Sequence, residues 1–147
     1  MPKARLIETR FGTLHQRSAT FLRAIEYPSG TSTMVLSGRF YGSGCRPVPL
    51  SGWFRYRLCF EGIVAQQVLE LDSWLGFLDH EGYQKSSLYE LVDSTWLADL
   101  RRPEHRHFVF RSYDEAFELL ATTCAIELWR PLPRRLEEAS DDEVHDG

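Results

Sequence analysis

The sequence predicts an α+β fold: a mostly antiparallel curved sheet or small β-sandwich of about five to seven strands, with two helices packed on one face or end. Three observations support this prediction. Apolar and polar residues alternate through much of residues 19–71, which is typical of half-buried strands. Turns containing Gly and Pro separate these runs. Two Ser-x-x-Glu sequences, Ser87–Glu90 and Ser112–Glu115, stand at the start of segments with helical apolar spacing.

Residues 53–60 are the clearest predicted strand. One face consists of Phe54, Tyr56, Leu58 and Phe60, and the other of Trp53, Arg55, Arg57 and Cys59. Residues 19–27 and 33–41 predict an antiparallel hairpin around a Pro-Ser-Gly turn. A second hairpin is predicted between residues 53–60 and 63–71, through a tight turn at Glu61-Gly62.

The second half of the chain predicts two helices and two further strands. The first helix begins at the capping box of Ser87–Glu90 and ends at Arg101-Arg102-Pro103, where bases complement the helix dipole and Pro stops the helix. A second helix is predicted over residues 112–121, between short strands at 107–111 and 124–129.

A chain of 147 residues fits one domain. We assign residues 1–133 to a single α+β domain and residues 134–147 to an acidic tail, which we expect to be disordered because its like charges repel. Six acids and no Lys or Arg follow Leu136, which leaves 15 acids against all 17 Lys and Arg in the preceding residues. This nearly neutral body disfavours nucleic acid as a partner, because backbone binding depends on clustered bases.

The cysteine pattern indicates a reducing compartment. Cys45, Cys59 and Cys124 are odd in number and widely spaced, unlike the cysteines of a disulfide framework. No run of about 18 apolar residues occurs, so no membrane-spanning helix is predicted. We therefore expect a cytoplasmic protein, and the sequence does not predict its oligomeric state.

No sequence motif indicates a catalytic residue or a cofactor. The most metal-like pair is His105 and His107, because residues two apart on a strand point to the same side. A metal site needs three or four ligands, and Asp79-His80-Glu81 and Glu104 would supply them only if the fold brought these segments together. A metal-dependent enzyme using His105 and His107 is thus an alternative to the simpler interpretation, polar residues at the entrance of a strand.

Trp53, Arg55 and Arg57 are the main candidate binding residues. Trp and Arg on one face can anchor a protein interface, or they can stack bases and hold phosphates of single-stranded nucleic acid. The simplest structural alternative is a solvated face whose Arg stems cover apolar surface. Trp74 and Phe77, in an aromatic cluster, are further candidates if that cluster is exposed rather than a lid on the core.

The order of segments resembles that of small bacterial domains, some of which are immunity proteins encoded beside secreted toxins. The similar features are the aromatic-rich strand at 53–60, the helix after it, and the strand–helix–strand unit that begins at Phe108. The resemblance covers residues 53–129 and transfers no functional residue. It implies a binding protein without a catalytic site. We therefore expect a non-catalytic, cytoplasmic protein-interaction domain, of inhibitor or immunity type, whose partner is another protein.

Overall fold

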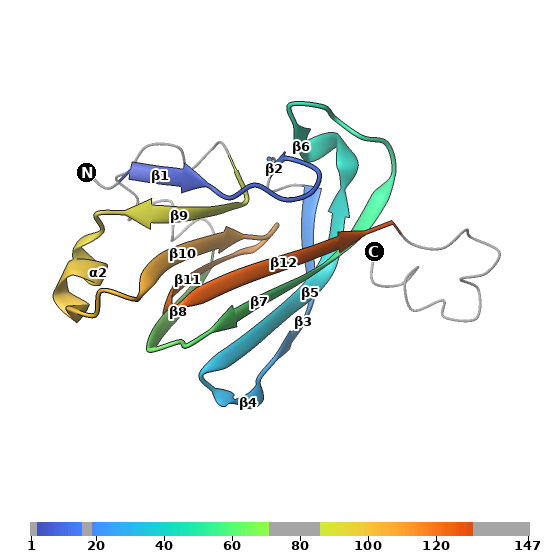
Figure 1. The fold of residues 1–147 in the computed structure, drawn as a ribbon. Helices are drawn as coiled ribbons and strands as arrows, with labels where there is room; N and C mark the ends of the chain where they lie inside the picture. The colour runs from blue at the N-terminus through green and yellow to red at the C-terminus, as the bar shows by residue number, and fades with distance from the viewer. Residues whose placement is uncertain (1–2, 16–18, 71–85, 131–147) are drawn as a thin grey trace.

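Antiparallel strands make up most of the described chain, which consists of residues 3–15, 19–70 and 86–130 of the computed structural model (Figure 1). The strands are β1 (Lys3–Leu6), β2 (Thr13–Leu14), β3 (Thr20–Glu26), β4 (Pro28–Thr31), β5 (Thr33–Tyr41), β6 (Cys45–Arg46), β7 (Trp53–Glu61), β8 (Ala65–Glu70), β9 (Leu88–Val92), β10 (Arg106–Arg111), β11 (Glu115–Ala121) and β12 (Thr123–Trp129). They are accompanied by a 3-10 turn, η2 (Gly42–Gly44), and a helix, α2 (Thr95–Leu100).

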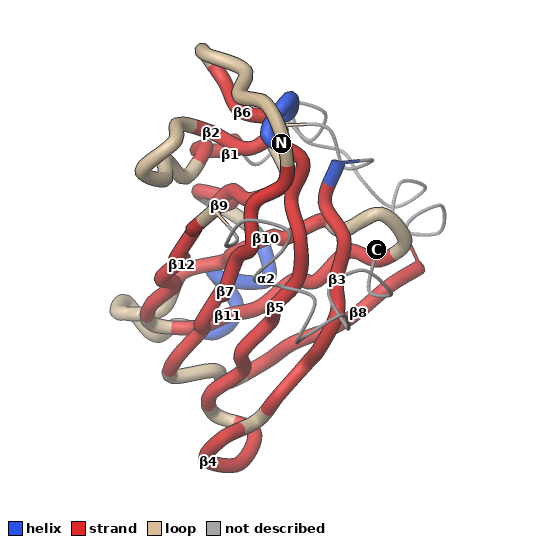
Figure 2. The backbone as a smooth tube through the Cα atoms, turned by 90° about the vertical axis from the view of Figure 1, so that its right-hand side faces the viewer, coloured by secondary structure: helices blue, strands red, loops and turns tan. Residues whose placement is uncertain are grey.

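The strands form three sheets. A five-stranded sheet has the order β1-β9-β10-β11-β8, a four-stranded sheet has the order β12-β7-β5-β3, and β2 pairs with β6. In Figure 2, the strands β3, β5 and β7 of the four-stranded sheet run side by side. The chain passes from the four-stranded to the five-stranded sheet between β7 and β8, and it returns between β11 and β12. Strands that switch sheets in this way build the corners of a sandwich.

Backbone hydrogen bonds hold this corner together. The Val64 N–H donates to the Leu120 carbonyl at 3.0 Å, and the Thr122 N–H donates to the Glu61 carbonyl at 2.9 Å. Each bond joins one of the two crossing connections to the end of the strand that leads into the other. The two large sheets are therefore covalently and non-covalently linked at the same place.

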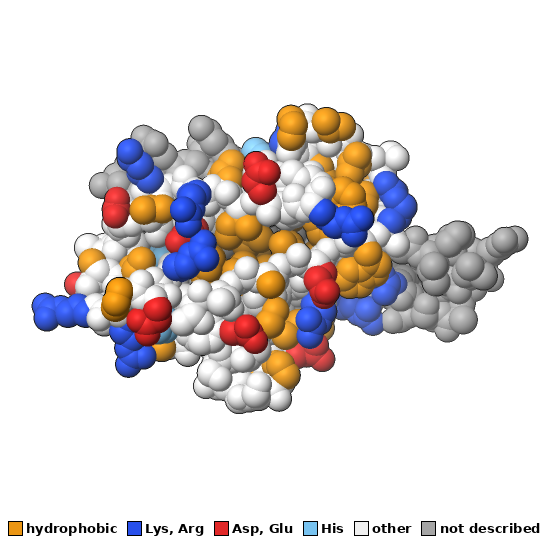
Figure 3. Space-filling model, viewed as in Figure 1, with side chains coloured by type: hydrophobic (Ala, Val, Ile, Leu, Met, Phe, Trp, Pro, Cys, Tyr) orange, Lys and Arg blue, Asp and Glu red, His pale blue; other side chains and the backbone are white. Residues whose placement is uncertain are grey.

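The main core lies between the two large sheets. Aromatic rings from opposite sheets meet there: the centroids of Tyr56 and Phe110 are 5.5 Å apart, and those of Phe60 and Phe108 are 5.8 Å apart. On the side drawn in Figure 3, apolar side chains lie in a hollow at the centre of the surface. A second cluster of Tyr89, Leu91, Val109 and Ala116 is buried on the opposite face of the five-stranded sheet.

The α+β prediction is wrong, and the fold is mostly antiparallel β. Within the described residues, α2 is a single α-helix of 6 residues, so there is no pair of helices on one face. The first predicted helix begins as strand β9 and is helical only from Thr95, where Ser94 accepts a hydrogen bond from the Leu97 N–H. The second predicted helix is strand β11.

Burial on both faces explains these errors. Phe117 and Leu119 of β11 point into the main core, while Ala116 and Leu120 are buried on the other face of the sheet. A strand that is buried on both faces has a continuous apolar run, which periodicity alone cannot distinguish from a helix. The Ser112–Glu115 capping contacts do form, with the Glu115 N–H donating to Ser112 Oγ at 3.1 Å, but they close the turn between β10 and β11.

The predicted hairpins have different outcomes. Strands β3 and β5 pair antiparallel, which confirms the first hairpin, and the tip between them contains β4. The second hairpin is wrong, because β7 pairs with β5 and β12 whereas β8 pairs with β11 in the other sheet. The alternation in residues 53–60 is confirmed as the inward and outward faces of β7.

No helix within the described ranges has the length and apolar character needed to cross a membrane. The predicted tail at 134–147 lies outside the described residues.

We expect Phe108→Ala to lower the free energy of unfolding by about 3–5 kcal/mol, because it removes a ring that packs against Phe60 and leaves a cavity between the sheets. Phe108 is 1% exposed, whereas Val68 on β8 is 46% exposed. Val68→Ala is therefore the matched control, with an expected loss below about 1 kcal/mol. Urea unfolding followed by tryptophan fluorescence measures both. Equal losses in the two variants would contradict the proposed core.

An ion-pair network centred on Glu90 joins three strands of the five-stranded sheet. Glu90 on β9 accepts hydrogen bonds from Arg106 on β10, at 2.7 and 3.0 Å, and from Arg5 on β1. Burial by itself raises the pKa of the Glu90 carboxyl, but the hydrogen bonds from Arg106 and Arg5 outweigh it, so the pKa is below its ordinary value.

Glu90→Gln is expected to lower the free energy of unfolding by about 1–2 kcal/mol at pH 7. Because the folded-state pKa is depressed, the contribution of the Glu90 carboxylate is complete above the unfolded pKa of about 4.3 and is lost as the pH falls through the folded value. Urea unfolding between pH 7 and pH 3 should therefore show the two proteins converging in acid. Glu26→Gln, at an exposed position of β3, is the control. A difference that stays constant with pH contradicts this assignment.

Candidate functional site

Trp53, Arg55 and Arg57 lie together on the outer face of the four-stranded sheet. Alternate residues of β7 point into the core, so these three residues point away from it. The sheet register places Arg39 of β5 and Trp129 of β12 on either side of Arg55. It likewise places Tyr41 beside Trp53. Together with residues of β3, they form a continuous surface that we name the arginine–aromatic face: Phe21, Arg23, Arg39, Tyr41, Trp53, Arg55, Arg57 and Trp129.

Ring contacts fix the centre of this face. The Arg39 guanidinium carbon lies 4.0 Å from the centroid of the Trp53 ring and 5.7 Å from that of Phe21. The Tyr41 ring packs against Trp53 with centroids 4.9 Å apart. A guanidinium over an indole is held by cation–π attraction as well as by van der Waals contact. The positive charge of Arg39 is therefore positioned before any ligand binds.

The arginine–aromatic face contains four Arg residues. Across the β7–β12 pair, a carboxylate oxygen of Glu127 is 3.9 Å from the Arg57 guanidinium. Both side chains of this pair are at least half exposed, so solvent screens their attraction. Arg57 is thus engaged at the edge of the face by its neighbour on β12.

A small pocket opens in the middle of the face. It has a volume of about 70 Å³, and its lining includes Arg23, Ser37, Arg39, Arg55 and Trp129. Arg23 lies on the same side of β3 as Phe21, and a β-bulge between Leu22 and Ala24 falls at this residue. The three arginines come from three neighbouring strands, β3, β5 and β7.

Gly38 keeps the backbone around this pocket closely packed. A Cβ atom at this position would lie 1.9 Å from the Phe21 carbonyl oxygen, so only glycine fits. The same oxygen accepts a hydrogen bond from the Tyr56 hydroxyl at 3.0 Å. Strands β3, β5 and β7 are thereby locked together at the base of the pocket.

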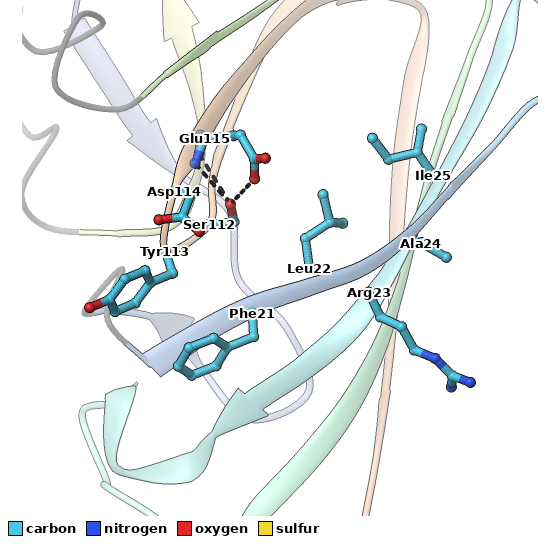
Figure 4. Close-up of a pocket in the computed structure, with 9 residues that line it drawn as sticks. All are labelled: Phe21, Leu22, Arg23, Ala24, Ile25, Ser112, Tyr113, Asp114 and Glu115. Carbon is cyan, nitrogen blue, oxygen red and sulfur yellow. Dashed lines mark hydrogen bonds between the residues drawn. The ribbon is translucent and has the colours of Figure 1, made fainter. Parts of the chain in front are cut away.

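A larger pocket of about 390 Å³ lies at the adjoining sheet edge, between β3 and the turn that connects β10 to β11 (Figure 4). Leu22 and Ile25 extend from β3 toward this turn, whereas Arg23 points the other way (Figure 4). Phe21 and Tyr113 stack across one end of the pocket with centroids 5.5 Å apart and an interplanar angle of 14°. This pocket therefore continues the arginine–aromatic face around the edge of the sheet.

The other sequence candidates lie elsewhere. Trp74 and Phe77 are outside the described residues. His107 is buried on the five-stranded sheet, where its Nε2 lies 2.8 Å from a Glu118 carboxylate oxygen and its ring meets the edge of Trp96. His105 precedes β10, with its Nδ1 3.6 Å from Glu104. In the described part of the chain, no three His, Cys, Asp or Glu side chains are grouped to hold a metal ion.

The three cysteines are free thiols whose surroundings oppose ionisation. Burial raises the pKa of Cys124 to about 12, despite the nearby Arg106 charge. Burial also raises the pKa of Cys45 and of Cys59. Since the thiolate is the reactive form, none of these positions has the electropositive, accessible surroundings of a catalytic cysteine.

Arg23, Arg39 and Trp129 were missed by the sequence-based prediction of the site. Arg39 had a signal, because it alternates with Phe40 in a predicted strand and therefore belongs to the outer face. Trp129 had none, because the sequence does not show that β12 pairs with β7. Arg23 also had a signal, because it alternates with Leu22 and shares a face with Phe21 in the predicted strand, but the sequence does not show that this strand lies beside Arg39.

No family model, no curated protein and no solved structure matches this chain.

In the folded protein, we expect iodoacetamide to alkylate Cys124 at pH 8 more than about a hundredfold more slowly than in the unfolded chain, because a pKa of about 12 leaves very little thiolate. Mass spectrometry of tryptic peptides after timed quenching measures the rate. The same protein in guanidinium chloride serves as the control. Rapid labelling of the native protein would contradict the assignment of Cys124 as a partly buried, structural thiol.

Proposed function

We propose that this chain is a non-catalytic, cytoplasmic protein-interaction domain of inhibitor or immunity type, and that its arginine–aromatic face binds an acidic segment of another protein. The observation that carries the proposal is the Arg39–Trp53 contact at 4.0 Å, with Arg55 in the neighbouring register position. This contact supports binding because it holds both a positive charge and an aromatic ring in position before a partner binds. Preorganised side chains lose less conformational entropy when they bind.

The residue types suit a protein partner that carries carboxylates. A guanidinium presents its N–H donors in a planar fork that matches a carboxylate, and such charge-assisted hydrogen bonds are stronger than neutral ones. Trp and Arg are also the residues most enriched among those that dominate binding energy at protein interfaces. Trp53 and Arg55 are partly buried, so a partner removes only a limited amount of water from them.

The size of the face favours a segment rather than a large domain. Strand β7 has 9 residues, which corresponds to a length of roughly 30 Å, and four strands span roughly 15 Å between the outer axes. The resulting area is roughly 450 Å², below the value of about 800 Å² per partner in a standard interface. An extended acidic segment with interspersed apolar residues fits this surface.

Single-stranded nucleic acid is the second candidate, because Trp53 could stack a base while Arg39 and Arg55 hold phosphates. The position of Glu127 on the same face argues against it, since a phosphate backbone running along β7 and β12 would meet this carboxylate. An acidic peptide could place an apolar residue there instead. Direct comparison of the two ligand classes decides between them.

The test uses a fluorescein-labelled peptide of alternating Glu and Tyr residues, with an oligothymidine of equal charge and a Lys–Tyr peptide as comparisons. We expect the Glu–Tyr peptide to bind best, with an affinity that falls as salt rises. Trp53→Ala combined with Arg55→Ala should weaken binding by at least about tenfold, as expected for residues near the centre of an interface. Fluorescence anisotropy measures these affinities.

Arg102→Ala is the control, because Arg102 is exposed beyond α2 and away from the four-stranded sheet. The affinity of the Arg102→Ala variant for the Glu–Tyr peptide should equal that of the unchanged protein. Binding that is insensitive to the double substitution would remove the arginine–aromatic face as the site. Tighter binding of the oligothymidine would replace the proposed function with the second candidate.

A further inference from the structure

We propose that the outer edge of β12 is a strand-addition site, where an extended segment of a partner protein pairs antiparallel with β12. The segment places apolar side chains between the two large sheets at one end of the edge and acidic side chains beside Arg5 and Arg106 at the other. This site goes beyond the proposed function, because it uses no side chain of the arginine–aromatic face. Its central observation is that the Leu128 carbonyl points away from β7 and accepts a hydrogen bond from Arg10.

The backbone of β12 presents a regular edge. In the described part of the chain, β12 is the last strand of the four-stranded sheet, and its 7 residues have a continuous register with β7. Arg10 Nη1 donates to the Leu128 carbonyl at 3.2 Å, so this carbonyl points outward. Because backbone groups alternate in direction along an antiparallel strand, those of Ile126 and Cys124 point the same way. A segment beside β12 can therefore bond to these residues, as peptides do at exposed sheet edges.

The other outer strands of the large sheets suit an acidic segment less well. Strand β3 has a bulge between Leu22 and Ala24, and the Tyr113 N–H already donates to the Thr20 carbonyl at 2.8 Å. A bulge disrupts the ladder that an added strand would extend. Strand β1 has only 4 residues, and β8 carries Glu70 but no Lys or Arg. The regular edge with positive charge beside it is that of β12.

Arg106 lies near the Cys124 end of this edge. Its guanidinium carbon is 5.0 Å from the centroid of the Phe108 ring on β10. That ring meets Phe60 across the core, with centroids 5.8 Å apart, and Phe60 is the register partner of Cys124. An added strand beside Cys124 therefore approaches Arg106.

The ion-pair network at this end carries a net positive charge. Glu90 shares the core-facing side of β9 with Leu88, and Arg5 lies opposite Glu90 in the register. Arg5 and Arg106 both bond to the Glu90 carboxylate, so two positive charges share one negative charge. The Arg5 and Arg106 side chains are 63% and 43% exposed, whereas that of Glu90 is 8% exposed. Each guanidinium has five N–H donors, so the network can bind another carboxylate while it keeps Glu90.

The Leu128 end of the edge is apolar. The Ile7 N–H donates to the Leu88 carbonyl at 3.3 Å, and Ile7 packs against the main core. Phe110 pairs with Leu88 on β9, and its ring meets that of Tyr56. Tyr56 is in turn the register partner of Leu128. The apolar hollow of Figure 3 lies between β9 and β12 in the view that it shares with Figure 1. Apolar side chains of an added strand can enter this hollow.

These two ends determine the sequence pattern of the segment. An antiparallel segment runs from the Leu128 end of β12 toward the Cys124 end, so its inward residues are first apolar and then acidic. The inward residues lie opposite Leu128, Ile126 and Cys124, and their own backbone groups must therefore point to β12. The residues between them point outward. The ligand is thus an extended segment in which alternate residues are apolar, apolar, acidic and acidic.

The test uses the full chain and a fluorescein-labelled peptide, Tyr-Thr-Val-Thr-Glu-Thr-Glu, whose affinity is measured by fluorescence anisotropy. We expect backbone N-methylation of the Val and the first Glu to weaken binding by at least about tenfold, because it removes two hydrogen bonds to β12. N-methylation of the second and third Thr should leave the affinity unchanged, because their N–H groups point away from β12. The two methylated peptides have the same composition and serve as matched controls for each other.

The protein supplies a second measurement. Arg5→Gln should weaken binding of the unmethylated peptide by about two- to fivefold, as expected for an exposed ion pair. Arg102→Gln is the control, because Arg102 is exposed beyond α2 and outside the arginine–aromatic face, and it should leave the affinity unchanged. Hydrogen exchange followed by NMR should show that the peptide slows exchange of the Ile126 amide. Exchange of the Ala125 amide, which points to β7, should stay the same.

Four results would overturn the strand-addition site. These are no binding of the unmethylated peptide, equal losses with the two methylated peptides, tighter binding of the reversed sequence Glu-Thr-Glu-Thr-Val-Thr-Tyr, and equal effects of Arg5→Gln and Arg102→Gln. Protection of the Ile126 amide that falls on dilution of the free protein would also overturn it, because a second copy of this chain would then occupy the edge. The proposed function is tested separately by its dependence on Trp53 and Arg55, so either proposal can fail while the other stands.

Discussion

The contact between the inner faces of the two large sheets determines the rest of this structure. Phe60 and Phe108 meet across it at one position, and Tyr56 and Phe110 meet at another. Each ring removes a large apolar area from water, at about 25 cal/mol per Å² buried. Because alternate residues of β7, among them Tyr56, Leu58 and Phe60, point inward, the residues that alternate with them, Trp53, Arg55 and Arg57, point outward. The position of the candidate site is thus a direct consequence of how the core is filled.

The strand connections turn this packing into a rigid support. Strands β7 and β12 carry the candidate site, and both continue into the connections that switch sheets at the corner. The hydrogen bonds from Thr122 to Glu61 and from Val64 to Leu120 close that corner. Arg55 and Trp129, which face each other across β7 and β12, therefore belong to a sheet whose pairing cannot slip without opening the core.

The sequence predicted the elements whose two faces differ and failed where both faces are buried. Residues 53–60 alternate cleanly because one face meets the core and the other meets solvent. Strand β11 has Phe117 on one face and Leu120 on the other, both fully buried, so its apolar run predicts a helix instead of a strand. The error at β8 has a different cause. A tight turn after Glu61 is compatible with a hairpin or with a change of sheet, and only the pairing of β8 with β11 decides between them.

The candidate site was predictable only along one strand. Trp53 and Arg55 share a face because of the two-residue period of β7, which is a local property. The approach of Arg39, Arg23 and Trp129 depends on register between strands that are distant in sequence, and no local pattern encodes it.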